Sequence, residues 1–115
     1  MITIVENGVH VVYITTDALY DHTDVQSVQE ELDRLLKTQP VQSLVIDFSQ
    51  VHAAGSAALS MLMRLRTKCA EDDRELGLSG MNTTVREVMK ITNLDGMFRI
   101  RDKADQFIQG PRPPR

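Results

Sequence analysis

The segment 43–48 (SLVIDF) constrains the fold most, because it is an apolar run of strand length with amphipathic helical patterns on both sides. Such a run is typical of a strand buried on both faces, as central parallel strands are. Apolar residues at helical spacing precede it over 23–39, and a second such pattern runs from Ser56 to about Glu71. Strands joined by single helices pair in parallel through right-handed crossovers. The sequence therefore predicts an α/β fold.

The N-terminal residues predict a β-hairpin at the edge of this sheet. Two runs rich in β-branched residues, 2–5 and 9–16, flank the dipeptide Asn7-Gly8. Asn-Gly readily takes the positive φ angles of a two-residue hairpin turn. The hairpin would add an antiparallel strand to an otherwise parallel sheet.

The C-terminal half continues the alternation of strands and helices. Residues 75–79 (ELGLS) predict a short strand, and Asn82 or Thr83 is expected to cap the short helix that follows. A last strand is expected over 97–100 (MFRI), and the apolar residues within 104–108 indicate a terminal helix. The helices are expected to lie mainly on one face of the sheet.

The chain has 115 residues, which is the length of one domain. We expect that domain to span residues 1–109 and the tail 110–115 (GPRPPR) to be extended or disordered, because its prolines cannot continue a helix. The one cysteine, Cys69, cannot form a disulfide within the chain. Neither a membrane-spanning run nor a signal-peptide pattern is present, so we expect a cytoplasmic protein without direct membrane insertion.

Charge and residue inventory argue against several functions. Thirteen Lys and Arg against sixteen Asp and Glu give a net charge of −3, without the basic excess of a nucleic-acid-binding protein. The histidines His10, His22 and His52 lie on different predicted elements, and with Cys69 they show no metal-ligand spacing. We therefore expect no nucleic-acid partner, no metal and no cofactor.

Asp47, His52 and Ser56 lie close together in sequence and suggest a catalytic triad. The strand-to-helix turn of a serine hydrolase requires G-x-S-x-G, but residues 54–58 here are AGSAA. A phosphate-binding loop is also absent, because residues 51–58 contain one glycine and no lysine. The sequence therefore favours a protein that is not an enzyme.

Ser56 lies at the predicted N-terminus of the second helix, among small residues. Its simplest role is that of an N-cap, which contributes about 1 kcal/mol, and physical reasoning from the residues alone favours that role. A phosphorylation switch is the functional alternative. A helix N-terminus tolerates a phosphate, and the phosphate adds about −1.5 to −2 charge to a surface that meets a partner.

Three segments resemble the STAS domain, the module of bacterial anti-sigma factor antagonists. Residues 45–51 (VIDFSQV) are similar to a family strand ending in D-L-S-x-V, and 55–62 (GSAALSML) fall where the family has D-S-S-G-L. Residues 76–98 are similar to the family's L-x-L-x-G, V-x-x-x-L and T-G-L-D-x-x-F pattern. The resemblance spans about 2–109. It implies a STAS-like mixed sheet of about four to five strands, with the N-terminal β-hairpin and about four helices.

The resemblance also implies a function. In that family the unphosphorylated domain binds an anti-sigma factor, a serine kinase of ATPase fold, which phosphorylates the first serine of D-S-S-G, and a phosphatase reverses the modification. Ser56 matches this serine, whereas Gly55, Ala57 and Ala58 replace the family's Asp, second Ser and Gly. The loss of the Asp either weakens recognition by the kinase or makes the unmodified surface more apolar and favours constitutive binding.

The expected partner-binding surface comprises Gly55, Ser56, Ala57, Ala58, Met61 and Arg64. Met61 is expected on the exposed helix face that carries Arg64, where a methionine adapts well to a partner. The alternative function is a STAS interaction subunit without phosphorylation, in a signalling scaffold or in a lipid or anion transport complex.

Overall fold

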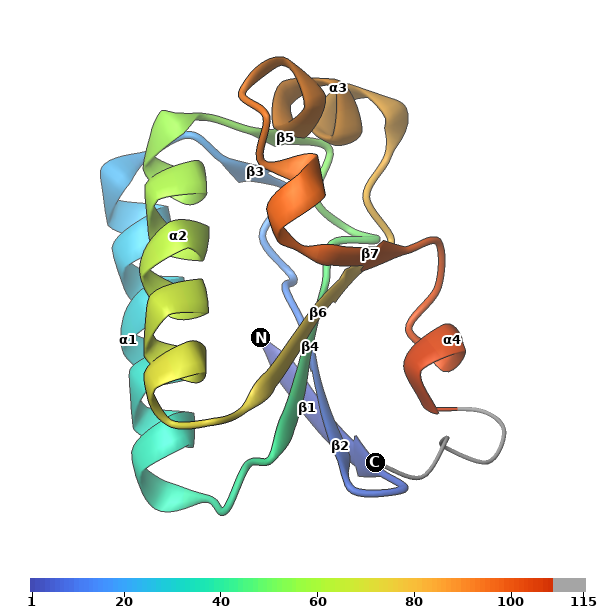
Figure 1. The fold of residues 1–115 in the computed structure, drawn as a ribbon. Coiled ribbons are helices and arrows are strands. Elements are labelled where there is room, and N and C mark those ends of the chain that lie inside the picture. The colour runs from blue at the N-terminus through green and yellow to red at the C-terminus, as the bar shows by residue number, and fades with distance from the viewer. Residues whose placement is uncertain (109–115) are drawn as a thin grey trace.

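The computed structural model of the chain describes residues 1–108, and its main sheet has five strands in the order β1-β2-β4-β6-β7 (Figure 1). These strands are β1 (Ile2–Glu6), β2 (Val9–Tyr13), β4 (Ser43–Asp47), β6 (Glu75–Ser79) and β7 (Arg99–Arg101). β1 is antiparallel to β2, and the other neighbouring pairs are parallel. The mixed sheet and its hairpin are confirmed. The tail predicted over 110–115 lies outside the described residues.

The N-terminal hairpin forms because its turn residues adopt the backbone angles that the turn requires. Asn7 has a φ of +51° and Gly8 a φ of +77°. The register that follows pairs Ile2 with Tyr13 and Glu6 with Val9. β2 is thereby placed inside the sheet, between β1 and β4, with β1 at the edge.

Helices α1 (His22–Thr38) and α2 (Ser56–Glu71) lie side by side on one face of the sheet (Figure 1). α1 buries the stripe that its helical spacing predicts: Val25, Val28, Leu32 and Leu36. α3 (Thr83–Ile91) lies at one end of the sheet, and the short α4 (Asp105–Ile108) lies on the other side from α1 and α2 (Figure 1). The helices of the described residues are thus mainly on one face, as expected.

The apolar run in β4 is explained by burial on both faces of the sheet. Leu44 and Ile46 belong to the main core, which α1 and α2 cover. Val45 points to the opposite face, where a smaller cluster includes Ala104 and Ile108 at the C-terminal end. Because successive side chains of a strand alternate between faces, a strand with a layer on each side needs apolar residues throughout.

Two features differ from the prediction. Residues 95–97 form a 3₁₀ turn, closed by a hydrogen bond from Met97 N to Leu94 O at 3.0 Å, so the last strand begins at Arg99 rather than at 97. A second, two-stranded sheet of β3 (Ala18–Leu19) and β5 (Ala53–Ala54) was not predicted. Strands of two residues are too short to produce a recognisable alternation of apolar and polar residues.

Candidate functional site

Ser56 is the first residue of α2, and its side chain is exposed to solvent. Gly55 occupies the N-cap position, so α2 has no side-chain cap. The Ser56 hydroxyl makes no hydrogen bond with any described residue. The interpretation of Ser56 as an N-cap is therefore wrong by one position, and its hydroxyl has no structural task at the helix end.

The backbone around Ser56 is that of an open helix N-terminus. The amides of Ala58 and Leu59 donate to Gly55 O at 3.1 and 3.2 Å, and Gly55 N donates to Leu19 O at 3.0 Å. The amides of Ser56 and Ala57 precede these bonds, where helix geometry leaves N–H groups without an intrahelical acceptor. A negative group on the Ser56 side chain would face the positive end of the helix dipole.

The ring of Tyr20 lies against Gly55. A Cβ atom at position 55 would approach Tyr20 Cδ1 to 2.8 Å, although the extended backbone there (φ −109°, ψ −170°) suits any residue. Tyr20 is 63% exposed, so its ring forms part of the surface beside Ser56. Large aromatic side chains at such places contribute strongly to protein interfaces. Sequence reasoning did not identify Tyr20, because only the pairing of β3 with β5 brings it to Gly55.

The small sheet of β3 and β5 holds this surface in place. Ala18 pairs with Ala53 and Leu19 with Ala54, and the Leu19 side chain is fully buried. Just before β5, His52 N donates to Asp17 O at 2.7 Å, and His52 Nδ1 lies 2.5 Å from Asp17 Oδ1. These contacts anchor the segment that leads into α2.

The predicted partner-binding residues of α2 divide into two groups. Ser56 and Arg64 are exposed, and Gly55 and Ala57 are partly exposed. Ala58 and Met61, each 1% exposed, belong to the buried stripe of α2, so the expectation of an exposed Met61 is wrong. The reason is that α2 packs against both α1 and β6, which buries a wider arc of the helix than one apolar stripe.

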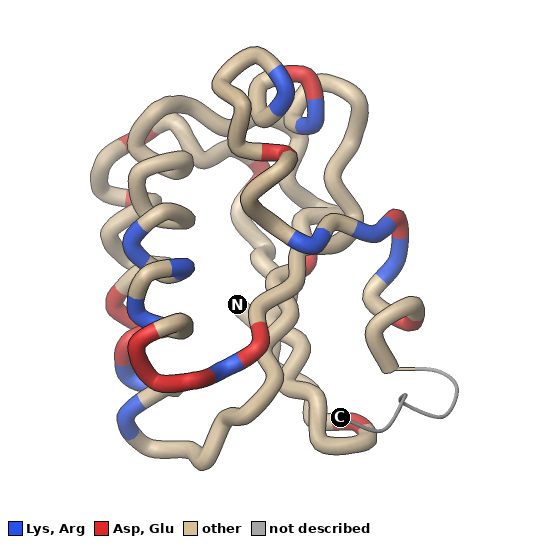
Figure 2. Tube along the Cα trace, in the orientation of Figure 1, with Lys and Arg blue, Asp and Glu red and all other residues tan. Residues whose placement is uncertain are grey.

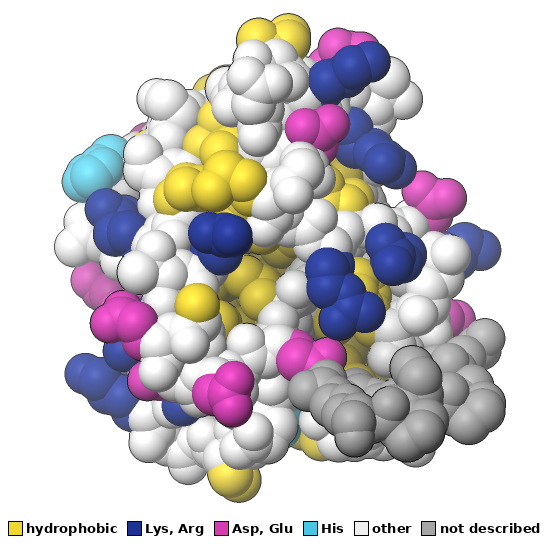
Figure 3. Space-filling view, in the orientation of Figure 1, with side chains coloured by type: hydrophobic (Ala, Val, Ile, Leu, Met, Phe, Trp, Pro, Cys, Tyr) yellow, Lys and Arg dark blue, Asp and Glu magenta, His cyan; other side chains and the backbone are white. Residues whose placement is uncertain are grey.

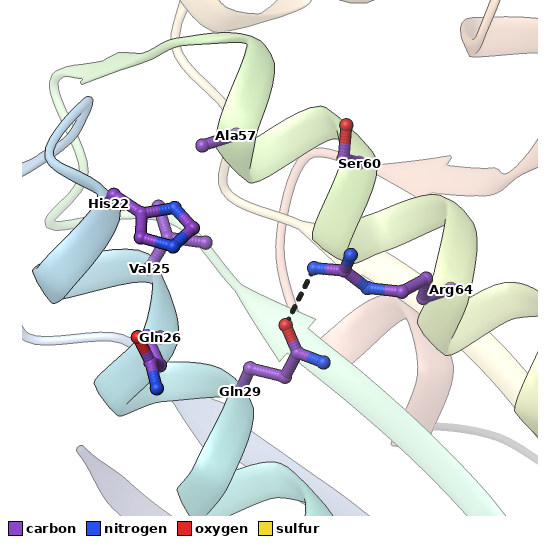
Figure 4. A pocket seen from close by; sticks show the side chains of 7 residues that line it. All are labelled: His22, Val25, Gln26, Gln29, Ala57, Ser60 and Arg64. Carbon is purple, nitrogen blue, oxygen red and sulfur yellow. Dashed lines mark hydrogen bonds between the residues drawn. The ribbon is translucent and has the colours of Figure 1, made fainter.

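A groove between α1 and α2 begins beside Ser56. It has a volume of about 560 Å³, and polar and apolar surface contribute equally to its lining: His22, Val25, Gln26, Gln29, Ala57, Ser60 and Arg64 (Figure 4). Arg64 Nη2 donates to Gln29 Oε1 at 2.7 Å, which bridges the two helices across the groove. Arg64 thus presents a positive charge on the same side of α2 as Ala57.

Asp47, His52 and Ser56 do not form a triad. The buried Asp47 carboxylate accepts hydrogen bonds from Ser49 N at 2.9 Å and from the hydroxyls of Ser49 and Ser79 at 2.5 and 2.8 Å. His52 pairs with Asp17 instead. Asp47 therefore ties the ends of β4 and β6 together, and Ser56 receives no hydrogen bond from either partner.

Residues 1–108 offer neither a cluster of metal ligands nor a membrane-spanning helix. Within residues 1–108, His, Cys, Asp and Glu side chains form no group of three that could hold a metal ion. Over the same residues, every helix is too short or too polar to cross a membrane.

The fold resembles several solved structures. An anti-sigma-factor antagonist (STAS) domain protein from Planctomyces limnophilus superimposes with a TM-score of 0.82 at 18% identity, covering 92% of each chain. An anti-sigma factor antagonist from Mycobacterium paratuberculosis gives 0.80 at 23% identity, over 91% of this chain and 86% of that chain. The antagonist SpoIIAA in its unphosphorylated form gives 0.74 at 14% identity, over 90% and 89%. The phosphorylated form of Bacillus SpoIIAA gives 0.67 at 13% identity, over 90% and 92%.

At these identities the structures establish the fold alone, and the family is established by sequence. A sequence model of the STAS domain matches residues 2–106, which is nearly the whole chain. The chain belongs to the STAS domain family.

Proposed function

We propose that this domain is a regulatory protein-binding module of the anti-sigma factor antagonist type, without catalytic activity of its own. Its partner is an anti-sigma factor with serine kinase activity, which docks on the Ser56 surface, defined as Tyr20, Gly55, Ser56 and Ala57. The similarity to solved antagonists, one of them known in phosphorylated and unphosphorylated forms, supports this class of function.

The exposed Ser56 hydroxyl, which has no bond to the described chain, is the observation that carries the proposal. Because Ser56 Oγ makes no hydrogen bond within the described chain, its phosphorylation would break none. The helix N-terminus would tolerate the added charge, so the domain would stay folded. The phosphate would then act on the partner, by placing about −1.5 to −2 charge in the interface.

Gly55 and Tyr20 support binding by the unmodified domain. The family's Asp would put a charge beside the phosphate acceptor, but here an exposed aromatic ring lies over a glycine. The unmodified surface is therefore more apolar than one that carries the family's Asp. A surface of this kind gains binding energy from burying the ring and loses it when a phosphate must be desolvated there.

The test is a pull-down from the source cells with wild-type, Ser56→Ala and Ser56→Asp baits, combined with mass spectrometry of the Ser56 peptide. Ser60→Asp is the matched control, because it places the same charge one turn further along α2 at another exposed serine. We expect a kinase of ATPase fold to bind wild type, Ser56→Ala and Ser60→Asp but not Ser56→Asp, and ATP to yield phosphate on Ser56.

If all four baits retain the same partner and Ser56 carries no phosphate, the domain is a constitutive adaptor. A transport ATPase or a scaffold protein as that partner would then favour the alternative of an interaction subunit.

A further inference from the structure

Strand β1 is an open edge of the main sheet. It pairs with β2 on one side, and no strand within residues 1–108 pairs with its other side. All of its residues, Ile2–Glu6, are exposed, and the exposed fraction is 54% for Ile2, 47% for Ile4 and 58% for Val5. An uncovered edge with apolar side chains is a template on which another strand can pair.

The opposite edge of the same sheet has protective features that β1 lacks. β7 is only 3 residues long, and its two exposed residues are arginines, Arg99 and Arg101. The tube of β7 is mostly blue in Figure 2, and Figure 3 shows basic side chains over this edge. Short, charged edge strands resist pairing with a second sheet. In contrast, β1 is 5 residues long, keeps a continuous register with β2, and carries no charged residue or proline before Glu6.

The hairpin turn determines which main-chain groups of β1 point outward. Glu6 and Val9 flank the two-residue turn and are register partners, so they exchange main-chain hydrogen bonds. Hydrogen-bonded and non-hydrogen-bonded pairs alternate along antiparallel strands, so Ile4 also bonds to β2. Thr3 and Val5 therefore direct their N–H and C=O groups away from β2. Among residues 1–108 no strand lies on that side to pair with them.

A second copy of β1 fits these outward groups when it is antiparallel to the first and centred on Ile4. Thr3 of each copy then faces Val5 of the other, and the two pairs exchange about four main-chain hydrogen bonds. The two Ile4 side chains meet across the two-fold axis in a non-hydrogen-bonded pair, where opposite side chains lie closest. The two Glu6 carboxylates lie at opposite ends of the contact, so this register brings no like charges together.

We propose that two copies of this chain pair through β1 in an antiparallel, two-fold symmetric dimer, which extends the main sheet across both copies. The same strand supplies donors and acceptors on both sides, as an isologous interface requires. A contact along roughly 17 Å of strand buries less surface than the roughly 1,200–2,000 Å² of a stable interface. The dimer is therefore reversible, with a Kd on the order of 0.1 mM. Because β1 shares no residue with the Ser56 surface, this inference does not depend on the proposed function.

The test is sedimentation equilibrium of the full chain, at concentrations from about 10 μM to about 1 mM, which bracket the expected Kd. We expect a monomer–dimer equilibrium in the wild type. Ile4→Lys and Ile4→Glu should each raise the Kd at least about tenfold, because each places two like charges opposite one another. An equimolar mixture of these two variants should dimerise more tightly than either variant alone, since opposite charges then face each other. Ile91→Lys is the matched control, because Ile91 is a 76% exposed isoleucine on α3, and it should leave the Kd unchanged.

Exchange of amide protons with solvent, measured by NMR, tests the geometry of the contact. The amides of Thr3 and Val5 should become protected as the protein concentration rises, whereas the amide of Ile4 already bonds to β2 and should not change. Thermal unfolding establishes that each variant is folded. A chain that stays monomeric at about 1 mM overturns the proposal, because the expected Kd is lower. A dimer that Ile91→Lys weakens as much as Ile4→Lys does, or one in which Thr3 and Val5 stay unprotected, also overturns it, because another surface would then join the copies.

Discussion

The ring of Tyr20 occupies the space that a side chain at Gly55 would need, with Tyr20 Cδ1 only 2.8 Å from the position of a Cβ atom. The two residues come from different segments and meet because β3 pairs with β5. This relationship links the identity of residue 55 to the position of an exposed aromatic ring beside Ser56. It also shows how the glycine and the tyrosine together give the surface its apolar character.

Gly55→Asp is expected to depend on Tyr20. An Asp at the N-cap of α2 can accept a hydrogen bond from the first turn, which stabilises a helix by a few tenths of a kcal/mol over Gly. When Tyr20 is present, its ring must move to make room for the Asp side chain, and the free energy that this movement costs offsets the gain from capping. In a Tyr20→Ala background the ring is absent, and Gly55→Asp should stabilise the protein. Urea unfolding of the wild type, the two single variants and the double variant measures the coupling, which we expect to be at least about 0.5 kcal/mol. Equal effects in both backgrounds would show that the contact is energetically irrelevant.

Ser56→Ala is expected to leave the free energy of unfolding within about 0.5 kcal/mol of wild type, as for an exposed residue without a structural role. Asn82→Ala is the contrasting variant, because Asn82 Oδ1 accepts from Val85 N at 2.8 Å and Nδ2 donates to His52 O at 3.1 Å. Loss of this cap should cost about 1 kcal/mol. Urea unfolding compares them directly. A loss of 1 kcal/mol on Ser56→Ala would restore the interpretation of Ser56 as a capping residue.

The sequence patterns that predicted the fold are those with a strong physical cause. Asn7-Gly8 determines the hairpin through its backbone angles, and the apolar run in β4 reflects burial on both faces. Met61 could not be placed correctly, because its burial depends on how α2 packs against α1 as well as on its helical position. Tyr20 was missed for a similar reason: two strands of two residues carry no periodic signal, yet they assemble the surface around Ser56.

Cys69 is expected to resist thiol reagents in the native state. Its side chain is 1% exposed, and burial raises the pKa of the thiol, an effect that Arg74 partly opposes. Because the thiolate is the reactive form, Cys69 should react with a disulfide reagent only when the domain unfolds. The reaction with Ellman's reagent should therefore accelerate across the urea transition. Rapid labelling without urea would contradict the burial.

The same pKa shift predicts a loss of stability at alkaline pH. The thiol of the unfolded chain loses its proton near pH 8.5, as an estimate for a free cysteine. The folded chain keeps its proton to higher pH, because its pKa is raised. The free energy of unfolding should therefore fall as pH rises above about 8.5, and more steeply in wild type than in Cys69→Ala. Urea unfolding at several pH values measures both slopes, and equal slopes would contradict the linkage.

Asp47→Ala is expected to destabilise the domain by about 2–4 kcal/mol, because it leaves buried donors without an acceptor. The Asp47 carboxylate is 4% exposed and accepts from Ser49 N and from Ser79 Oγ, which is fully buried. Asp47→Asn keeps an acceptor toward Ser49 but presents its amide NH₂ to Ser79 in place of the second oxygen, so its cost should be intermediate. Ser79→Ala removes the partner instead and should cost less than Asp47→Ala, since Ser49 still satisfies the carboxylate. Urea unfolding of the three variants establishes the order. If Asp47→Ala were as stable as wild type, the hydrogen bonds at the ends of β4 and β6 would contribute nothing to stability, and the prediction would be wrong.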